Sequence, residues 1–195
     1  MGLAKALGER RLEYASIHYT SEAQADESAT SLIHHLLLIT KLIVLLSIAN
    51  GTPVAVKRAL RDRFSQPLDG GLMLFDGRRL FGPSKTIRGA LASVAFTTAV
   101  ASLLGLQASV GAVVGGMAII GDLFSSFVKR RLGFAPSSQA MILDQIPEAL
   151  FPVLAYSVLL PLSALDIVVV VASFSVGAIL ISPIFHRIGL RDRPF

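Results

Sequence analysis

The stretch GDLFSSFVKRRLGFAPSSQAMILDQIPE, residues 121–148, contains the side chains on which we expect the fold to depend. Its first acid, Asp122, follows residues 89–121, which are 33 residues without Asp, Glu, Lys or Arg. A carboxylate at the edge of so apolar a segment is costly unless a cation or a polar partner meets it. Asp122 is therefore the first candidate for a functional residue.

The helical spacing after Asp122 gathers further polar side chains. If a helix continues past this acid, Ser126 and Lys129 follow at positions i+4 and i+7 and share its face, with Arg130 beside them. After a short loop, a second acid, Asp144, enters the next apolar segment. Two carboxylates and a Lys-Arg pair at the same end of two neighbouring membrane helices suit a divalent cation that holds a polyphosphate.

The composition indicates a membrane-embedded protein of one compact domain. Of the 195 residues, 53% are apolar and only 16% are charged, and the mean hydropathy is +0.66. The absence of cysteine excludes a disulfide framework and a thiolate zinc site. The net charge of +5 is compatible with binding to nucleic acid, anionic lipid or a phosphorylated substrate. The distribution of charge along the chain is needed to distinguish these partners.

Five apolar segments are each long enough to cross about 30 Å of hydrocarbon. Gly51 and Pro53 predict that the first helix ends at residues 50–53. We therefore predict an all-α, polytopic integral membrane protein with five transmembrane helices. Residues 31–195 form the membrane-embedded domain, and residues 1–30 form a polar extension, an amphipathic helix followed by a flexible segment. The five segments are about 32–49, 89–106, 109–128, 140–160 and 165–185.

The distribution of positive charge predicts the orientation. Eight Lys and Arg residues lie in the loop 50–88, three in residues 129–139 and three in the tail 186–195, all on one side of the membrane. The short loops on the other side have none, so the positive-inside rule places the N-terminus outside and the charged loops in the cytoplasm. The predicted active-site cavity then faces the cytoplasm. Asp166, on the outer side, is interpreted as a helix cap.

The loop 50–88 is rich in turn-forming residues, which favours an ordered, functional segment. Residues 82–89 precede an apolar helix, so their backbone amides, Lys85 and Arg88 could hold phosphate groups. The alternative is that these basic residues only mark the topology, and the same alternative applies to the basic residues 129–131. Asp69 could equally bind a ligand or form an Asx-turn.

Five motifs occur in order along the chain, with apolar spans between them. They are NGTP at 50–53, PLDGG at 67–71, DGRRLFGPSKTIRG at 76–89, GDLFSSFVKRR at 121–131 and LDQIPE at 143–148. Together they resemble the CDP-archaeol synthases, archaeal membrane cytidylyltransferases related to the bacterial CDP-diacylglycerol synthases. The resemblance covers residues 31–195. The His-Gly-Gly of the bacterial signature is absent, and Ala135-Pro136 stands in place of its Lys-Asp, which favours the archaeal branch.

The resemblance implies transfer of the cytidylyl group from CTP to 2,3-bis-O-(geranylgeranyl)-sn-glycerol 1-phosphate in the bilayer, with release of pyrophosphate. It implies Mg²⁺ held by Asp122 and Asp144, Lys129 and Arg130 as further catalytic residues, and no nucleic-acid partner. The lipid chains are expected in an apolar groove between spans, and the oligomeric state is left open. The expected nucleotide-binding residues are Asn50, Thr52, Asp69, Gly70, Gly71, Lys85, Thr86, Arg88 and Ser126.

Two other functions are compatible with the same residues. A CTP-dependent polyprenol-type lipid kinase would release CDP in place of pyrophosphate. In a small ion or proton transporter, Asp122 and Lys41 would line the path. Against the transporter, the polar groups gather at one face and no inverted repeat is apparent in the sequence.

Overall fold

The structure, a computed structural model, describes residues 2–135, 140–158 and 162–187, so most of the basic tail and Pro136 lie outside the described residues. The described residues form α-helices and, in place of strands, two isolated β-bridges, which confirms the all-α prediction. The chain divides into two compact units, Met1–Thr40 and Lys41–Phe195. The five helices are α1 (Gly2–Leu60), α2 (Ile87–Leu103), α3 (Ala108–Arg131), α4 (Met141–Ser157) and α5 (Ala164–Arg187).

Two segments are long and apolar enough to cross a membrane, Asp26–Leu60 in α1 and Ala108–Arg131 in α3. Two further apolar helices are shorter, Ile87–Leu103 and Ala164–Leu180. Helix α3 continues through Asp122 to Arg131, as the spacing of its polar residues predicted. The residues for which we predicted a flexible segment near the N-terminus lie within α1.

Our prediction that the first helix ends at residues 50–53 is wrong, because α1 continues through Pro53 to Leu60. Proline has no amide hydrogen, so the carbonyl of Ala49, four residues earlier, loses its helical donor. The hydroxyl of Ser93 in α2 donates to this carbonyl at 2.7 Å, and Ser93 is buried. A side chain from the neighbouring helix therefore replaces the missing bond, which allows the helix to continue.

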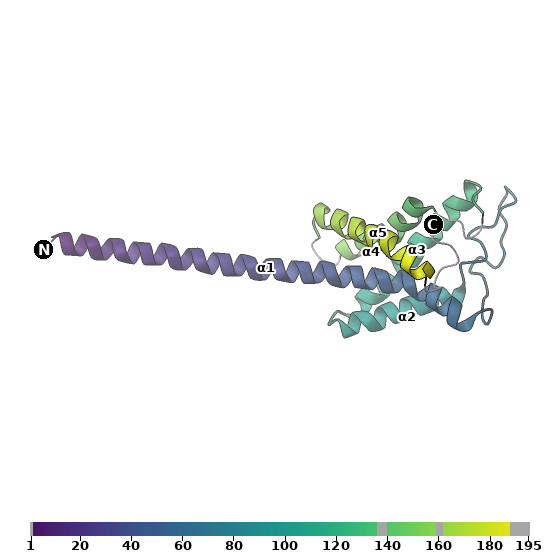
Figure 1. Cartoon of the computed structure of the whole chain (residues 1–195), viewed down its shortest axis with the longest axis horizontal. Helices are drawn as coiled ribbons and strands as arrows, with labels where there is room; N and C mark the ends of the chain where they lie inside the picture. Colours follow the sequence, from purple (N-terminus) through teal and green to yellow (C-terminus); the bar gives the residue numbers. More distant parts are fainter. Residues whose placement is uncertain (1, 136–139, 159–161, 188–195) are drawn as a thin grey trace. The chain divides into compact units, whose positions relative to one another are not determined.

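Helix α3 packs against both α2 and α4, and α5 packs against α4 (Figure 1). Glycine allows the contact between α2 and α3 to be close: a Cβ atom on Gly111 would lie 2.6 Å from the Cα of Thr98, and one on Gly115 would lie 3.0 Å from the Cα of Val94. The prediction that Asp166 caps a helix is confirmed. Asp166 and Ser163 cap α5 reciprocally, with the backbone amide of each bonded to the side chain of the other.

The loop between α1 and α2 covers residues 61–86 and is shorter than predicted, since α1 continues to Leu60. Its ends are held together by hydrogen bonds from Leu68 N to Lys85 O at 2.7 Å and from Ile87 N to Gln66 O at 3.1 Å. Residues 72–80 form a hairpin, with bonds from Leu80 N to Leu72 O and from Leu74 N to Arg78 O. The loop is thus ordered, as its turn-rich sequence predicted.

The role of Ser93 is tested by Ser93→Ala, which leaves the buried carbonyl of Ala49 without a donor. We expect a loss of about 1–3 kcal/mol in unfolding free energy, because an unsatisfied buried acceptor bears its full desolvation cost. Thermal or denaturant unfolding in detergent would measure the change. The matched control is Ser102→Ala on the same helix, where an exposed hydroxyl donates to Thr98 O and the expected change is within about 0.5 kcal/mol. Equal effects of the two variants would contradict the account of Pro53.

Candidate active site

Two lysine–aspartate ion pairs lie at one end of the helical bundle, where the loop 61–86, the end of α3 and the start of α4 meet. The amine of Lys85, from the loop, is paired with the carboxylate of Asp122 in α3. The amine of Lys129 in α3 lies 2.5 Å from Oδ1 of Asp144 in α4. The side chain of Lys129 is only 9% exposed. Charges this poorly solvated need opposite partners, so the two pairs fix the three segments against one another.

The two pairs belong to one cluster. Lys129 also interacts electrostatically with Asp122, and Lys85 with Asp144. A third carboxyl group completes the cluster, because Glu148, one turn after Asp144 on α4, interacts electrostatically with Asp122. Burial alone would lower the pKa of Lys85, but the charge of Asp122 outweighs it and raises that pKa above its usual value. Lys85 is therefore a full positive charge at neutral pH.

A glycine allows α3 and α4 to approach closely at this cluster. A Cβ atom on Gly121 would lie 2.2 Å from the carbonyl oxygen of Pro147 and 2.9 Å from the amide nitrogen of Glu148. No side chain fits in that space. The residue before Asp122 therefore packs directly against the backbone beside Glu148, which explains how the two carboxyl groups reach one another.

Arg130 and Ser126 are buried in α3 on the same side as the cluster. Arg130 interacts electrostatically with Asp144, and its guanidinium donates to Ala135 O at 2.8 Å. Within the described part of the chain, its buried Nε has no hydrogen-bond partner. The sequence prediction thus placed Asp122, Lys129, Arg130 and Asp144 together correctly, and this Nε is a donor available to a bound group.

Asp69 lies in the loop 61–86 and stabilises the fold of that loop. Its carboxylate accepts hydrogen bonds from the amides of Gly71, Phe81 and Gly82 at 2.9–3.1 Å and from the guanidinium of Arg79 at 3.2 Å. Burial alone would raise the pKa of Asp69, but the three amides and Arg79 outweigh it and hold that pKa below its usual value. The geometry favours the Asx-turn interpretation, in which Asp69 shapes the loop that presents Lys85.

The remaining predicted nucleotide-binding residues have mainly structural contacts. Thr86 caps α2 by accepting a hydrogen bond from Gly89 N, and Arg88 donates to the carbonyls of Arg61 and Arg63. Thr52 donates to Ile48 O within α1. Gly70 and Gly71 have φ values of +55° and +88°, which the turn requires and which other residues rarely adopt.

Asn50 differs from these residues because the buried Nδ2 of its side chain has no hydrogen-bond partner within the described residues. A buried amide donor without a partner is costly. Asn50 therefore remains a candidate for binding a ligand, as predicted from the NGTP motif.

An apolar groove of about 360 Å³ runs between α4 and α5. Gln145, which is adjacent to Asp144, lines it, and so does Ser175, whose buried hydroxyl has no partner among the described residues. The remaining lining is aliphatic. It consists of Ile146, Leu150, Ile167, Val168, Val171, Ala172 and Ile179.

Sequence reasoning missed several residues of this site. Glu148 was not predicted as a site residue, although its i+4 spacing from Asp144 was a usable signal. Arg78 and Arg131 were treated as loop and topology charges, yet each donates to backbone carbonyls of the other's segment. These contacts join residues 53 and 52 positions apart, so no local pattern could indicate them.

Carboxylates are the metal-ligating groups in this cluster. Among the described residues, no three His, Cys, Asp or Glu side chains are arranged to hold a metal ion by themselves. Asp122 and Asp144 each have a lysine amine against a carboxylate oxygen. Their charge is thus balanced by lysines in this structure.

Apolar helices with a cluster of paired charges at one end define the class of the protein, a membrane-embedded helical protein. A family model described as "CarS-like: CDP-archaeol synthase" matches residues 33–195. The chain therefore belongs to the CDP-archaeol synthase family.

Individual relatives agree with this membership. The chain is 33% identical over 161 residues to a CDP-archaeol synthase of Thermofilum pendens, covering 76% of each chain. It is 35% identical over 149 residues to one of Pyrobaculum calidifontis, covering 72% of this chain and 81% of the relative. A solved structure described as an intramembrane enzyme for archaeal membrane lipids biosynthesis matches with a TM-score of 0.59 and 30% identity, over 70% of this chain and 90% of that one.

Gly121→Ala tests the close approach of α3 and α4. The new Cβ would overlap the carbonyl of Pro147, so we expect a loss of about 1–3 kcal/mol in unfolding free energy together with loss of catalytic activity. Gly116→Ala on the same helix is the matched control, because its Cβ would meet nothing within 4 Å. The control should be neutral or slightly more stable, since alanine is the better helix former. Unfolding midpoints that agree between the two variants would refute the close contact.

The pH dependence of stability tests the role of Asp69. Because its folded-state pKa is lowered, Asp69 contributes stability that is fully present above its ordinary value of 3.8 and is lost as the pH falls through the folded-state value. Asp69→Asn should therefore be less stable than the parent at neutral pH, and this difference should narrow on acidification below that value. Asp62→Asn, an exposed change in the same loop, is the matched control and should leave the unfolding free energy at neutral pH within about 0.5 kcal/mol of the parent. If the difference in unfolding free energy between Asp69→Asn and the parent stays constant through the acid range, the stabilising role of the ionised Asp69 is contradicted.

Proposed function

We propose that this chain transfers the cytidylyl group of CTP to an isoprenoid ether-lipid phosphate, forming a CDP-lipid of the archaeol type and pyrophosphate. The observation that carries the proposal is the convergence of the Lys85–Asp122 and Lys129–Asp144 pairs at one end of the bundle. Membership of the CDP-archaeol synthase family also supports the proposal. The relatives' names give the product, and the solved relative's description gives the intramembrane setting.

The cluster has the charges that a nucleotide triphosphate requires. Lys85 and Lys129 provide ammonium groups, and Arg130 has a buried Nε that is free of hydrogen bonds within the described residues. On binding, the two lysines exchange their aspartate partners for phosphate oxygens. This exchange keeps each lysine paired in both states, so that neither lysine charge is left uncompensated.

The carboxylates released by that exchange fit Mg²⁺ in chemistry. Magnesium prefers hard oxygen ligands and is commonly bound by one or two carboxylates together with substrate phosphates. Asp122 and Asp144 would hold it, with Glu148 adjacent to them. When bound, the ion would neutralise charge on the phosphates of the nucleotide. The need for phosphate ligands agrees with the absence of a three-residue protein cage among the described residues.

The reaction is a displacement at the α-phosphorus of CTP. An oxygen of the lipid phosphate forms a bond to this phosphorus, and the bond to the oxygen that bridges to the β-phosphorus breaks. Pyrophosphate leaves with that electron pair. A phosphate monoester is already ionised at neutral pH, so no general base is required, and the lysines and Arg130 act by positioning and by stabilising charge.

The groove between α4 and α5 suits the lipid substrate. Its aliphatic lining is compatible with isoprenoid chains, and Gln145 places one end of it next to Asp144. A lipid in this groove would have its phosphate near the charged cluster and its chains along the helices. The groove is therefore the proposed lipid site.

We also propose five membrane spans, with the charged cluster on the cytoplasmic side and the N-terminus outside. Two helices are long and apolar enough to cross by themselves, and the two shorter apolar helices pack against them or against α4. The positive charges of the loop 61–86 and of the end of α3 support a cytoplasmic location for the cluster. Cytoplasmic CTP then has direct access.

Product analysis tests the function. Purified protein incubated with labelled CTP, Mg²⁺ and a geranylgeranyl ether-lipid phosphate should yield a labelled CDP-lipid and one pyrophosphate per turnover. Release of CDP with a doubly phosphorylated lipid would establish a kinase in its place, and absence of any lipid product would refute the proposal.

Asp122→Asn should lower this activity by at least about 100-fold, because it removes a carboxylate that would hold Mg²⁺ against the nucleotide phosphates. The matched control is Asp62→Asn, the same chemical change at an exposed loop position, and it should retain parental activity. Undiminished turnover by Asp122→Asn would exclude Asp122 from the site. Unfolding midpoints of both variants would separate a loss of chemistry from a loss of fold.

A further inference from the structure

We propose that Asp76, Arg78 and Arg131 form a clamp that positions Lys85 for nucleotide binding. Asp76 and Arg78 lie in the hairpin 72–80, and Arg131 is the last residue of α3. None of the three is part of the charged cluster itself. The inference rests on the proposed function, because Lys85 is the group through which the clamp would act.

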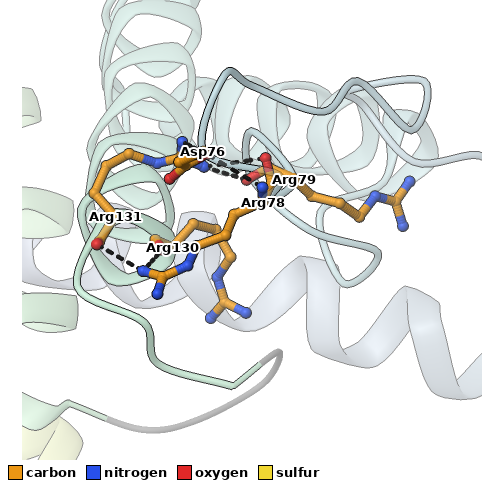
Figure 2. Close-up of polar contacts among 5 residues, drawn as sticks. All are labelled: Asp76, Arg78, Arg79, Arg130 and Arg131. Atoms are coloured by element: carbon orange, nitrogen blue, oxygen red, sulfur yellow. Dashed lines mark hydrogen bonds and ion pairs between the residues drawn. The ribbon is translucent and has the colours of Figure 1, made fainter.

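The clamp is reciprocal (Figure 2). Nη1 of Arg78 donates to the carbonyls of Arg130 at 3.1 Å and Arg131 at 2.8 Å. In return, the guanidinium of Arg131 donates to Oδ1 of Asp76 at 2.5 Å and to the carbonyls of Arg79 at 2.7 Å and Arg78 at 3.3 Å. Each arginine thus binds the backbone of the segment that contains the other.

These bonds give partners to carbonyls at the end of α3, where the last four carbonyls of a helix have no donor within the helix. Arg78 donates to the carbonyl of Arg131 and to that of Arg130, which also accepts from Gly133 N. A positive charge at this end is also favoured by the helix dipole. The planar guanidinium, with several donors in fixed directions, can serve a carboxylate and carbonyls together, which a lysine amine cannot do with the same geometry.

The surroundings hold the two guanidinium groups in place. Arg131 lies over the ring of Phe127, with 5.4 Å between its Cζ and the ring centroid. Gly133 lies beside Arg78, and a Cβ atom there would be 3.2 Å from its Nη atoms. Gly133 also has a φ value of +84°, so this tight turn after α3 favours glycine on both counts.

A chain of short contacts connects the clamp to Lys85. Asp69 fixes the end of the hairpin and the residues that follow it, because it accepts from Arg79, Phe81 and Gly82. The Arg79 side chain accordingly extends away from the clamp (Figure 2). The carbonyl of Lys85 then accepts from Leu68 N at 2.7 Å. The clamp fixes one side of this folded loop to α3, the helix that contains Asp122, and so holds Lys85 opposite its partner.

A double-mutant cycle tests this positioning role. Asp76→Asn removes the carboxylate that Arg131 binds, and we expect kcat/KM for CTP to fall about 10- to 100-fold, as for displacement of a catalytic group by about 1 Å. In a Lys85→Ala background, the same change should cost less than about twofold, because the group that the clamp positions is already gone. Asp62→Asn, which removes the same charge from an exposed part of the loop, should have no effect in either background.

The outcomes separate this inference from the proposed function. If Lys85→Ala impairs the reaction but Asp76→Asn has the same fold effect in both backgrounds, the clamp does not act through Lys85 and the inference is overturned while the function stands. If the parent protein makes no CDP-lipid, the proposed function itself has failed.

A second pair of variants covers the case in which Asp76→Asn does not fold. Arg78→Lys and Arg131→Lys keep the charge but lose the fixed multiple donors. Each should give stable protein with kcat/KM for CTP lowered about tenfold, an effect that again disappears in the Lys85→Ala background. Full activity of both lysine variants would overturn the inference.

Discussion

The ion pair between Lys85 and Asp122 is the interaction on which the rest of the structure depends. It joins a loop residue to the middle of an apolar helix, across 37 positions of sequence. Neither charge could remain half-buried alone at tolerable cost. The loop must therefore return to the second half of α3, and the second pair, Lys129 with Asp144, brings α4 to the same part of that helix. Two electrostatic requirements thus gather three distant segments into one site.

The helical framework meets a related requirement, because side chains supply donors to backbone carbonyls that the helices themselves leave without one. Ser93 supplies the donor that Pro53 removes from α1, and Arg78 supplies donors to the end of α3. Gly121 allows the backbones of α3 and α4 to meet beside the carboxyl groups. The irregular features of the sequence, a proline within a helix and a glycine before an acid, are therefore the features that build the site.

The sequence predicted the parts of the site that follow from local periodicity. Asp122, Ser126, Lys129 and Arg130 lie on one helix because their spacing is helical, and Asp144 was recognisable as an acid entering an apolar segment. It could not predict features decided by distant residues. Pro53 looked like a helix end because the hydroxyl that compensates for it belongs to Ser93, which lies 44 residues from Ala49, the residue whose carbonyl it binds. Arg88 was interpreted as a phosphate ligand and Asp69 as either a ligand-binding residue or part of an Asx-turn, but the partners of both are groups of the loop itself.

Zero-length cross-linking most directly tests the central claim, that the loop returns to place Lys85 against Asp122. Both side chains are about one quarter exposed, at 23% and 26%, so a carbodiimide can activate the carboxylate and join it to the amine in native membranes. Mass spectrometry of the digested protein should then identify a peptide pair linked between Lys85 and Asp122, with a second pair linking Lys129 to Asp144. If Lys85 is instead joined only to loop carboxylates such as Asp62, and never to Asp122, the account is contradicted.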